Sequence, residues 1–348
     1  MNPSLPVIQG QYFHDLMAQP QAVAATLESL TRGGAWRRVE SLVSRQDWRR
    51  VVLTGMGASY HALQPLHLAL LGSGRSSVLI ETSELIHYGM AMCDPQTLLV
   101  VVSQSGGSAE TTRLLDLNRG APLLAVTNTP GSPLARQADV ALLTAAGVEF
   151  SVSCKTYSAA LVALQWLAAL LSAHAESEVT RRLESAPALL HAYLSAWPDH
   201  LQSLIPRLAG MRHLFLAGRG ASLAAVGTGA LIIKEAARFH AEGMSSAALR
   251  HGPLEMLQAD MLSVVLSGDQ HTRDLNRGLL HTLTTQGRRC DELGCGAPNV
   301  ALRLPDCDPL LMPLLEIAPI QMMTLALAAL TGREAGCFEH ASKITDVE

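Results

Sequence analysis

Short runs of aliphatic and β-branched residues alternate, along the first half of the chain, with longer segments in which alanine and leucine recur at helical spacing. This alternation is typical of a parallel sheet whose strands are joined by helical crossovers. A turn and a helical pattern follow each run, so the first half is predicted to form one α/β unit. The expected strands are Val51–Thr54, Ser77–Glu81, Leu98–Val102, Leu123–Thr127 and Val140–Leu143.

The same pattern restarts in the second half. LTGMGAS, from Leu53 to Ser59, is matched by LAGRGAS, from Leu216 to Ser222, and VVVSQSGGS has a degenerate counterpart in SVVLSGDQ. Two copies of one α/β unit are therefore expected. The predicted organisation is a helical lead-in (1–30), a first domain (31–176), a linker helix region (177–206), a second domain (207–335) and a C-terminal tail (336–348).

Composition narrows the class of protein. The 348 residues are 48% hydrophobic and 16% charged, which favours a well-buried core over disorder. The net charge of −4 gives no electrostatic reason to expect a nucleic acid or an anionic membrane as partner. Residues 313–330 are nearly all apolar, but Glu316, Pro319 and Gln321 interrupt them, so a buried core or interface helix is expected rather than a membrane span.

Six cysteines are scattered along the chain, and no secretory segment precedes them, which favours a reduced, cytoplasmic protein. Cys290 and Cys295 lack a second Cys or His pair at metal-site spacing, so no zinc site is predicted. No metal or other cofactor is expected.

The two Gly-x-Gly stretches, GMGASY and GRGASL, each follow a predicted strand and so resemble part of a dinucleotide-binding motif. Tyr60 and Leu223 stand where the third glycine of that motif belongs, which argues against such a site. The alternative is a tight strand-to-helix turn in which Ser59 and Ser222 are the N-caps.

The stretch VVVSQSGGSAETT changes from apolar to hydroxyl-rich within one residue. A helix N-terminus attracts anions, and Gly106 and Gly107 would allow close approach of the backbone. Neutral donors suit a phosphate monoester, but capping of the helix explains the same residues equally well. The donors are Ser103, Gln104, Ser105 and Ser108. In the second copy Asp269 would repel an anion, so phosphate is expected only in the first.

Two further residues are candidates for proton transfer. Glu235 shares part of the apolar face of a predicted helix, where desolvation would favour its protonated form and make it a useful base. His251 precedes Pro253, which can begin a helix, and a histidine there could transfer protons near neutral pH. Lone buried glutamates and histidines are, however, more often structural than catalytic. Lys343 lies in the C-terminal ASKITDVE, whose alternating hydrophobic pattern suggests a specific role but does not identify one.

Taken together, these segments resemble the sugar isomerase (SIS) domain family, and above all the isomerase half of glutamine:fructose-6-phosphate aminotransferase and its stand-alone relatives. The likeness spans nearly the whole chain, in QYFHDLMAQP, GMGASY, ETSELIHYG, SQSGGSAET, TNTPGSPLARQAD, GVEFSVSCKTYSAAL, GRGAS, ALIIKEAARFHAEGMSSAALRHGPL and SKITDVE. The resemblance implies an α/β fold of two tandem flavodoxin-like SIS domains, each a five-stranded parallel sheet flanked by helices, usually paired as a homodimer.

The resemblance also implies roles for residues. Ser103, Gln104, Ser105, Ser108 and Ser59 would bind the phosphate of a small phosphosugar. Glu235 would move a proton between C1 and C2, His251 would open the sugar ring from the partner subunit, and Lys343 would contact the open-chain sugar. The tail would close the active site. Further residues expected to line the substrate are Gly57, Ala58, Val152 and Ser342.

Departures from the aminotransferase shape the functional prediction. Thr228 and Ile232 replace a Glu and a Lys of the aminotransferase, and the loop SVSCKTY is one residue shorter. The glutamine-hydrolysing domain is not expected, so the predicted activity is deamination of glucosamine 6-phosphate to fructose 6-phosphate. The alternatives are a fructosamine 6-phosphate deglycase, for which Ile232 could leave room, a plain aldose–ketose isomerase, and a non-catalytic sugar-phosphate sensor.

Overall fold

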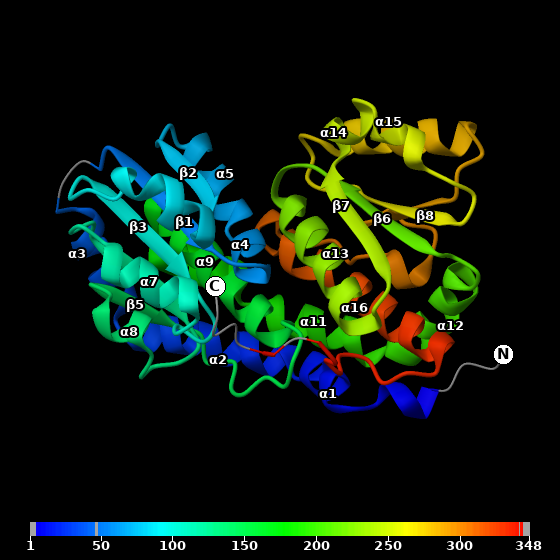
Figure 1. The fold of residues 1–348 in the computed structure, drawn as a ribbon, viewed down its shortest axis with the longest axis horizontal. Helices are drawn as coiled ribbons and strands as arrows, with labels where there is room; N and C mark the ends of the chain where they lie inside the picture. The colour runs from blue at the N-terminus through cyan, green and yellow to red at the C-terminus, as the bar shows by residue number, and fades with distance from the viewer. Residues whose placement is uncertain (1–4, 46–47, 341, 344–348) are drawn as a thin grey trace. The chain divides into compact units, whose positions relative to one another are not determined.

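The computed structural model describes residues 5–45, 48–340 and 342–343. The chain forms two compact units (Figure 1). The first-sheet unit comprises residues 19–149, 155–187 and 342–348, and the second-sheet unit comprises residues 1–18, 150–154 and 188–341. Each unit therefore gathers stretches that are far apart in the sequence.

The first-sheet unit is built on a five-stranded parallel sheet with the order β2-β1-β3-β4-β5. Every strand predicted from the sequence is present, within one residue of its expected bounds. The central strand β3 is buried along its whole length because helices cover both faces of the sheet. The strands are β1 (Arg50–Gly55), β2 (Ser77–Glu81), β3 (Thr97–Val102), β4 (Leu123–Thr127) and β5 (Val140–Leu143).

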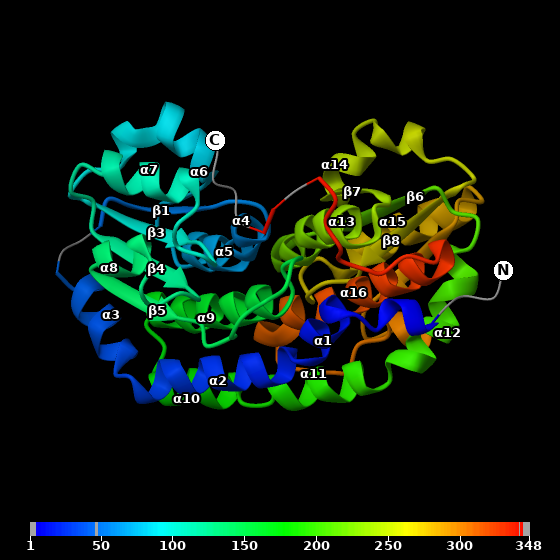
Figure 2. The ribbon, with the colours of Figure 1, turned by 60° about the horizontal axis from the view of Figure 1, so that its bottom comes forward.

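Helices lie on both faces of this sheet. Figure 2 shows α7 on one side and α9 with α2 on the other. The helices of this unit are α2 (Gln19–Arg32), α3 (Ala35–Val43), α4 (Ala58–Ala62), α5 (Gln64–Gly72), α6 (Thr82–Glu84), α7 (Ala109–Leu117), α8 (Pro133–Gln137), α9 (Lys155–Leu171) and α10 (Glu176–Leu183), with the short turns η2 (Leu85–Gly89) and η3 (Met90–Met92).

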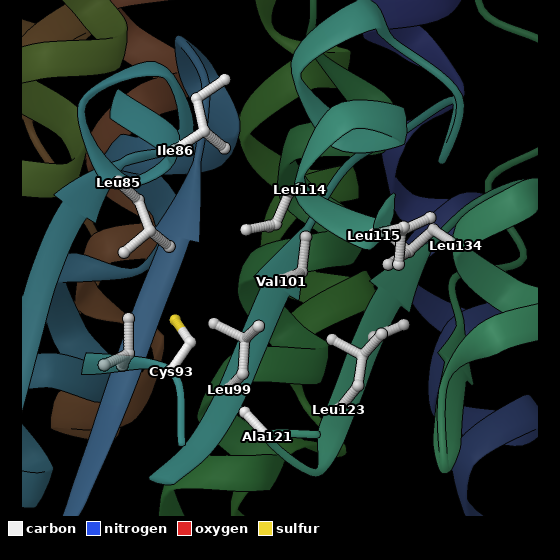
Figure 3. Packing of buried hydrophobic residues seen from close by; sticks show 12 residues of the cluster. Leu85, Ile86, Cys93, Leu99, Val101, Leu114, Leu115, Ala121, Leu123 and Leu134 are labelled. Carbon is white, nitrogen blue, oxygen red and sulfur yellow. The ribbon is translucent and has the colours of Figure 1, made fainter. Parts of the chain in front are cut away.

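The α7 face of the sheet carries an apolar core that fixes the start of this helix (Figure 3). Leu99 and Val101 of β3 are fully buried, and Leu114 of α7 packs against the same cluster. Burying side chains of this size stabilises the packing by about 1.5–3 kcal/mol each. The N-terminus of α7, which follows β3 directly, is thereby held at the carboxyl edge of the sheet.

The second-sheet unit contains a four-stranded parallel sheet, in the order β7-β6-β8-β9, within the described residues. The prediction of five strands in each sheet was therefore wrong for the second sheet. The segment after β9 makes only one parallel bridge, Gly294 to Arg303. In the sequence, Pro298 precedes Arg303 and Pro305 follows it, and proline cannot donate a hydrogen bond to a strand ladder. The strands are β6 (His213–Gly218), β7 (His240–Ser245), β8 (Met261–Leu266) and β9 (Cys290–Leu293).

The long apolar segment of this unit is a core helix, as the sequence analysis expected. Residues Pro309–Thr331 have a mean hydropathy of 1.7, enough to cross a membrane by composition, but 89% of the apolar window is buried in the protein. The helices here are α1 (Gln11–Met17), α11 (Ala186–Ser195, which starts in the first-sheet unit), α12 (Trp197–Leu208), α13 (Leu223–Ala237), α14 (Ser246–Arg250), α15 (Arg273–Thr285) and α16 (Met312–Thr331). Short turns are η1 (Leu5–Ile8), η4 (Gly220–Ser222), η5 (Pro253–Met256), η6 (Val300–Leu302) and η7 (Pro309–Leu311).

Candidate functional site

The candidate site lies at the carboxyl edge of the first sheet, between β1 and β3. From β1 the chain continues to β2 on one side, whereas β3 lies on the other, so the strand order reverses here. Open α/β sheets bind ligands at such a switch point, because the loops that follow the two strands diverge and leave a crevice. The turn at Gly57 follows β1, and the serine-rich loop 103–108 follows β3.

The serines of this loop both fold it and present donors. Ser103 Oγ accepts a hydrogen bond from Gly106 N–H (3.2 Å), and Ser105 Oγ accepts one from Gly107 N–H (3.3 Å). Ser108 caps α7, since its Oγ accepts from Thr111 N–H (3.4 Å). In Ser103 and Ser105 the oxygen is the acceptor, so the O–H is the group left to donate to an anion. Capping and phosphate binding are therefore compatible functions of one loop.

Backbone contacts fix the loop against the neighbouring strand. The carbonyl of Gln104 accepts from Asn128 N–H (3.1 Å) and from the hydroxyls of Thr127 and Thr129 (3.3 Å each). Gly106 adopts φ +61°, and a Cβ there would lie 2.2 Å from Ser132 Oγ, so only glycine fits. The donors are thus placed before any ligand arrives, which lowers the entropic cost of binding.

A cavity of about 330 Å³ opens at this loop. It brings together all five predicted phosphate-binding residues, and Lys343 from the C-terminal tail joins them. The lining residues are Met56, Gly57, Ser59, Val102, Ser103, Gln104, Ser105, Ser108, Glu110, Thr111 and Lys343. Four lining residues were not predicted from the sequence: Met56, Val102, Glu110 and Thr111. The last two lie in the first turn of α7, and recognising that this turn faces the site would have found them.

Lys343 is held at this cavity by a carboxylate. Its Nζ lies 2.5 Å from Oε2 of Glu149, whose side chain is fully buried, while the Lys343 side chain is 24% exposed. Glu149 also accepts hydrogen bonds from the Thr156 N–H (3.0 Å) and hydroxyl (2.6 Å) in the first turn of α9. The sequence analysis did not single out Glu149. Of the tail, only Ser342 and Lys343 lie within the described residues after residue 340, and Ser342 is exposed.

The two predicted proton-transfer residues belong to the second-sheet unit. Glu235 lies near the end of α13 and is half-buried rather than buried. His251 is exposed at the C-cap of α14, where its N–H binds the Ala248 carbonyl (2.9 Å), and η5 begins at Pro253 as expected. Val152, which was expected to line the substrate, is 1% exposed within this same unit. Ala58, another expected lining residue, is the first residue of α4 in the first-sheet unit.

The corresponding edge of the second sheet is occupied by its own side chains. Arg219 Nε donates to Ser246 Oγ (2.8 Å), Ser246 donates to Asn276 Oδ1 (2.7 Å), and Asn276 Nδ2 donates to the Ser267 carbonyl (3.2 Å). Asp269 accepts from the backbone N–H groups of His271 (2.9 Å) and Thr272 (3.2 Å). A carboxylate thus takes the place that a serine has in the first copy.

The N-cap role considered for Ser59 was wrong, and that for Ser222 is confirmed in position only. Ser59 lies inside α4, whose N-cap is Gly57. Ser222 occupies the N-cap of α13, but its hydroxyl donates to Glu316 Oε1 of α16 (2.8 Å) and makes no cap hydrogen bond. The Glu316 side chain is wholly buried, so desolvation raises its pKa from 4.5 to about 8, although the Ser222 hydrogen bond opposes the shift.

Thr228 and Ile232, which differ from the aminotransferase, are both buried in α13. Ile232 is 0% exposed, so its side chain packs in the core of the unit and does not open room for a larger substrate. The six cysteines are all free thiols. No group of three or more His, Cys, Asp or Glu side chains placed to hold a metal ion occurs among residues 5–45, 48–340 and 342–343.

Comparison with known proteins identifies the family. The family described as "SIS domain" matches residues 46–170 and 207–290, which is more than half of the chain. A glutamine–fructose-6-phosphate aminotransferase [isomerizing] from Pyrococcus horikoshii is 29% identical over 355 residues, covering 98% of this chain and 59% of the relative. The chain therefore spans little more than half the length of this relative.

Solved structures share the fold. The tagatose-6-phosphate ketose/aldose isomerase from Escherichia coli has a TM-score of 0.81 at 19% identity, with 95% of each chain covered. The glucosamine-6-phosphate deaminase from Thermotoga maritima has a TM-score of 0.76 at 17% identity, covering 96% of this chain and 99% of that one. The matched family, the two parallel sheets and the serine-rich loop at the switch point agree with one another, and the chain belongs to the SIS domain family.

Proposed function

We propose that the protein is a phosphosugar isomerase of the SIS type that deaminates glucosamine 6-phosphate to fructose 6-phosphate and ammonia. The observation that carries the proposal is the preformed loop, in which Ser103 and Ser105 accept from backbone N–H groups and keep their O–H donors for the cavity. Such donors at the N-terminus of α7 suit the phosphate of a sugar monophosphate. When the phosphate anchors the sugar, the binding energy of the phosphate helps to position C1 and C2 for reaction.

The chemical steps are assigned to Glu235 and His251. His251 opens the pyranose ring by acid–base transfer, a role that its exposed side chain supports. Glu235 then moves the proton from C2 to C1 of the open-chain amino sugar, which gives a ketose imine. Water adds to this imine, and loss of ammonia leaves fructose 6-phosphate. As a homodimer, the protein would use His251 from the partner subunit.

Likeness in fold to a deaminase supports this choice of reaction. The glucosamine-6-phosphate deaminase from Thermotoga maritima aligns over 99% of its chain. A plain aldose–ketose isomerisation is the second candidate, because the tagatose-6-phosphate isomerase fold aligns equally completely. The deglycase alternative loses its main argument, since Ile232 is buried. A silent sensor needs the loop alone, so the presence of Glu235, His251 and Lys343 argues against it.

A substrate panel tests the proposal. The purified protein is incubated with glucosamine 6-phosphate, fructosamine 6-phosphate, tagatose 6-phosphate, and fructose 6-phosphate plus ammonia, and free ammonia and the sugar phosphates are measured. Ammonia and fructose 6-phosphate from glucosamine 6-phosphate are the expected products. Turnover of tagatose 6-phosphate alone would favour the isomerase, and binding without turnover in all four mixtures would favour the sensor.

The variant Glu235→Gln tests the assigned chemistry. It should reduce kcat at least a hundredfold, on the order of what general acid–base catalysis contributes, and leave phosphosugar binding intact. The matched control is Glu242→Gln, which removes an exposed carboxylate from β7 of the same unit. Full activity of Glu235→Gln would remove Glu235 from the mechanism.

A further inference from the structure

The ion pair between Glu149 and Lys343 assigns a function to a residue outside the predicted site. Lys343 lines the cavity together with the serine-rich loop. Glu149 follows β5 and is not among the lining residues, yet its Oε2 lies 2.5 Å from the Lys343 Nζ. The contact joins positions 194 residues apart in the sequence. The Glu149 carboxylate therefore holds the Lys343 side chain in place without itself lining the cavity.

The surroundings of Glu149 fix its carboxylate in one place. Oε1 accepts from Thr156 N–H, and Oε2 accepts from the Thr156 hydroxyl as well as from Lys343. The two Thr156 donors belong to the first turn of α9, a helix of 17 residues, where the helix dipole also favours a negative charge. Because the side chain is fully buried, water cannot substitute for these partners.

The contacts of Glu149 limit where the Nζ of Lys343 can lie. Glu149 makes a direct ion pair with this Nζ, and Glu110 lines the same cavity. Because Thr156 holds the Glu149 carboxylate, the lysine Nζ is held at the cavity in turn.

We propose that Glu149 is a positioning residue, which fixes the Nζ of Lys343 at the wall of the substrate cavity. This inference rests on the proposed function, because it takes the cavity to be the phosphosugar site. Held in this way, Lys343 is a hydrogen-bond donor for the bound sugar phosphate. Glu149 acts on the substrate solely through Lys343.

A double-mutant cycle tests this role. Glu149→Gln, Lys343→Met and the double variant are compared with the wild type for binding of fructose 6-phosphate and of inorganic phosphate by calorimetry. Each single variant should weaken fructose 6-phosphate binding about tenfold to a hundredfold, the range for losing a hydrogen bond to a charged group. In the Lys343→Met background, Glu149→Gln should add almost nothing. Equal losses in both backgrounds, or no loss in either, would overturn the proposal.

The control separates positioning from folding. Thr156→Val removes a hydroxyl donor to the same carboxylate and retains the ion pair. It should lower the unfolding temperature and weaken sugar-phosphate affinity much less than Glu149→Gln does, because the Thr156 N–H and Lys343 still hold the carboxylate. If its affinity falls as far as that of Glu149→Gln, Glu149 is merely structural and the proposal fails.

The two ligands and a turnover assay distinguish the remaining outcomes. A loss for both ligands places the Lys343 ammonium at the phosphate, and a loss for fructose 6-phosphate alone places it at the sugar; either supports the proposal. Wild-type binding without turnover would refute the proposed activity and leave the cycle interpretable. Absence of wild-type binding to both ligands would refute the site and the role of Glu149 together.

Discussion

Gly106 determines the shape of the serine-rich loop at the level of a single residue. Its φ of +61° disfavours any side chain, and an added Cβ would lie 2.2 Å from Ser132 Oγ and 2.9 Å from Thr127 Oγ1. Both hydroxyls belong to the β4–α8 segment against which the loop is fixed. Any side chain at this position must therefore displace the loop from its support.

Gly106→Ala should lower the free energy of unfolding by about 2–4 kcal/mol, since left-handed strain and overpacking add. Gly107→Ala is the matched control, because the φ of Gly107 is not positive. The atom nearest to an added Cβ there, Pro133 Cδ, would be 3.6 Å away, which is an ordinary contact. Urea unfolding of the two variants measures the difference. Equal stabilities would show that the loop relaxes freely and that glycine is not required at position 106.

Residue types reveal some site residues in the sequence and hide others. The cluster Ser103, Gln104, Ser105 and Ser108 is conspicuous because neutral donors crowd one short stretch. Glu149 gives no such signal, since its neighbours in GVEFS are ordinary and its partner Lys343 is 194 residues away. The role of a lone buried carboxylate depends on a long-range contact, and no local sequence pattern encodes such a contact.

At the scale of elements, a buried hydrogen bond links two helices of the second-sheet unit. Ser222, at the N-cap of α13, donates to Glu316 in α16 (2.8 Å). The other carboxylate oxygen, Oε2, is buried and has no hydrogen-bond partner among the described residues. A protonated carboxyl is less costly to bury than a charged one, so burial favours the neutral form of Glu316, and the Ser222 hydrogen bond opposes it only in part.

Glu316 should make stability depend on pH. Burial raises the pKa of the folded-state carboxyl to about 8, against 4.5 for an unperturbed glutamate. As the pH rises from 4.5, the unfolded chain ionises first, so this group's contribution to stability falls until the pH passes about 8. The loss is on the order of a few kcal/mol. Glu316→Gln stays neutral and should flatten the decline.

Urea unfolding at a series of pH values between 4.5 and 8 measures this slope. Glu242→Gln, with an exposed glutamate, should retain the wild-type slope. An unchanged slope in Glu316→Gln would show that the carboxyl does not titrate in this range.

Strands of the first sheet follow from sequence because each is a short apolar run between turn signals. The second sheet departs from the expected five strands where composition is mixed. There, the segment after β9 contains Pro298 and Pro305, and pairing shrinks to the bridge between Gly294 and Arg303. The repeated sequence motifs predicted two copies of one unit. The number of hydrogen bonds between the strands of each sheet also depends on where the prolines lie, and the motifs do not show this.

At the scale of the whole molecule, the second-sheet unit is assembled from both ends of the chain. The Tyr12 hydroxyl in α1 lies 3.2 Å from the Thr324 hydroxyl in α16, a separation of 312 residues in sequence. Both side chains are buried, so the pair has no access to water as an alternative partner. The N-terminal segment is thereby part of the same core as α16.

Tyr12→Phe and Thr324→Val should each lower the free energy of unfolding by about 1–3 kcal/mol, because each leaves a buried hydroxyl without this partner. The double variant should lose less than the sum, since the hydrogen bond that the two residues share is lost only once. Thermal or urea unfolding of all four proteins gives the coupling. Additive losses would show that the two hydroxyls do not stabilise the fold as a pair.

The contact between Tyr12 and Thr324 also constrains how the protein is made. At about 5–20 residues per second, a ribosome reaches Thr324 roughly 15–60 s after Tyr12. For that interval Tyr12 has been made but the Thr324 side of this buried contact has not, although Phe13 can pack edge-on against Trp197 once that residue is synthesised. The segment that carries Tyr12 therefore completes its packing only after α16 has been translated.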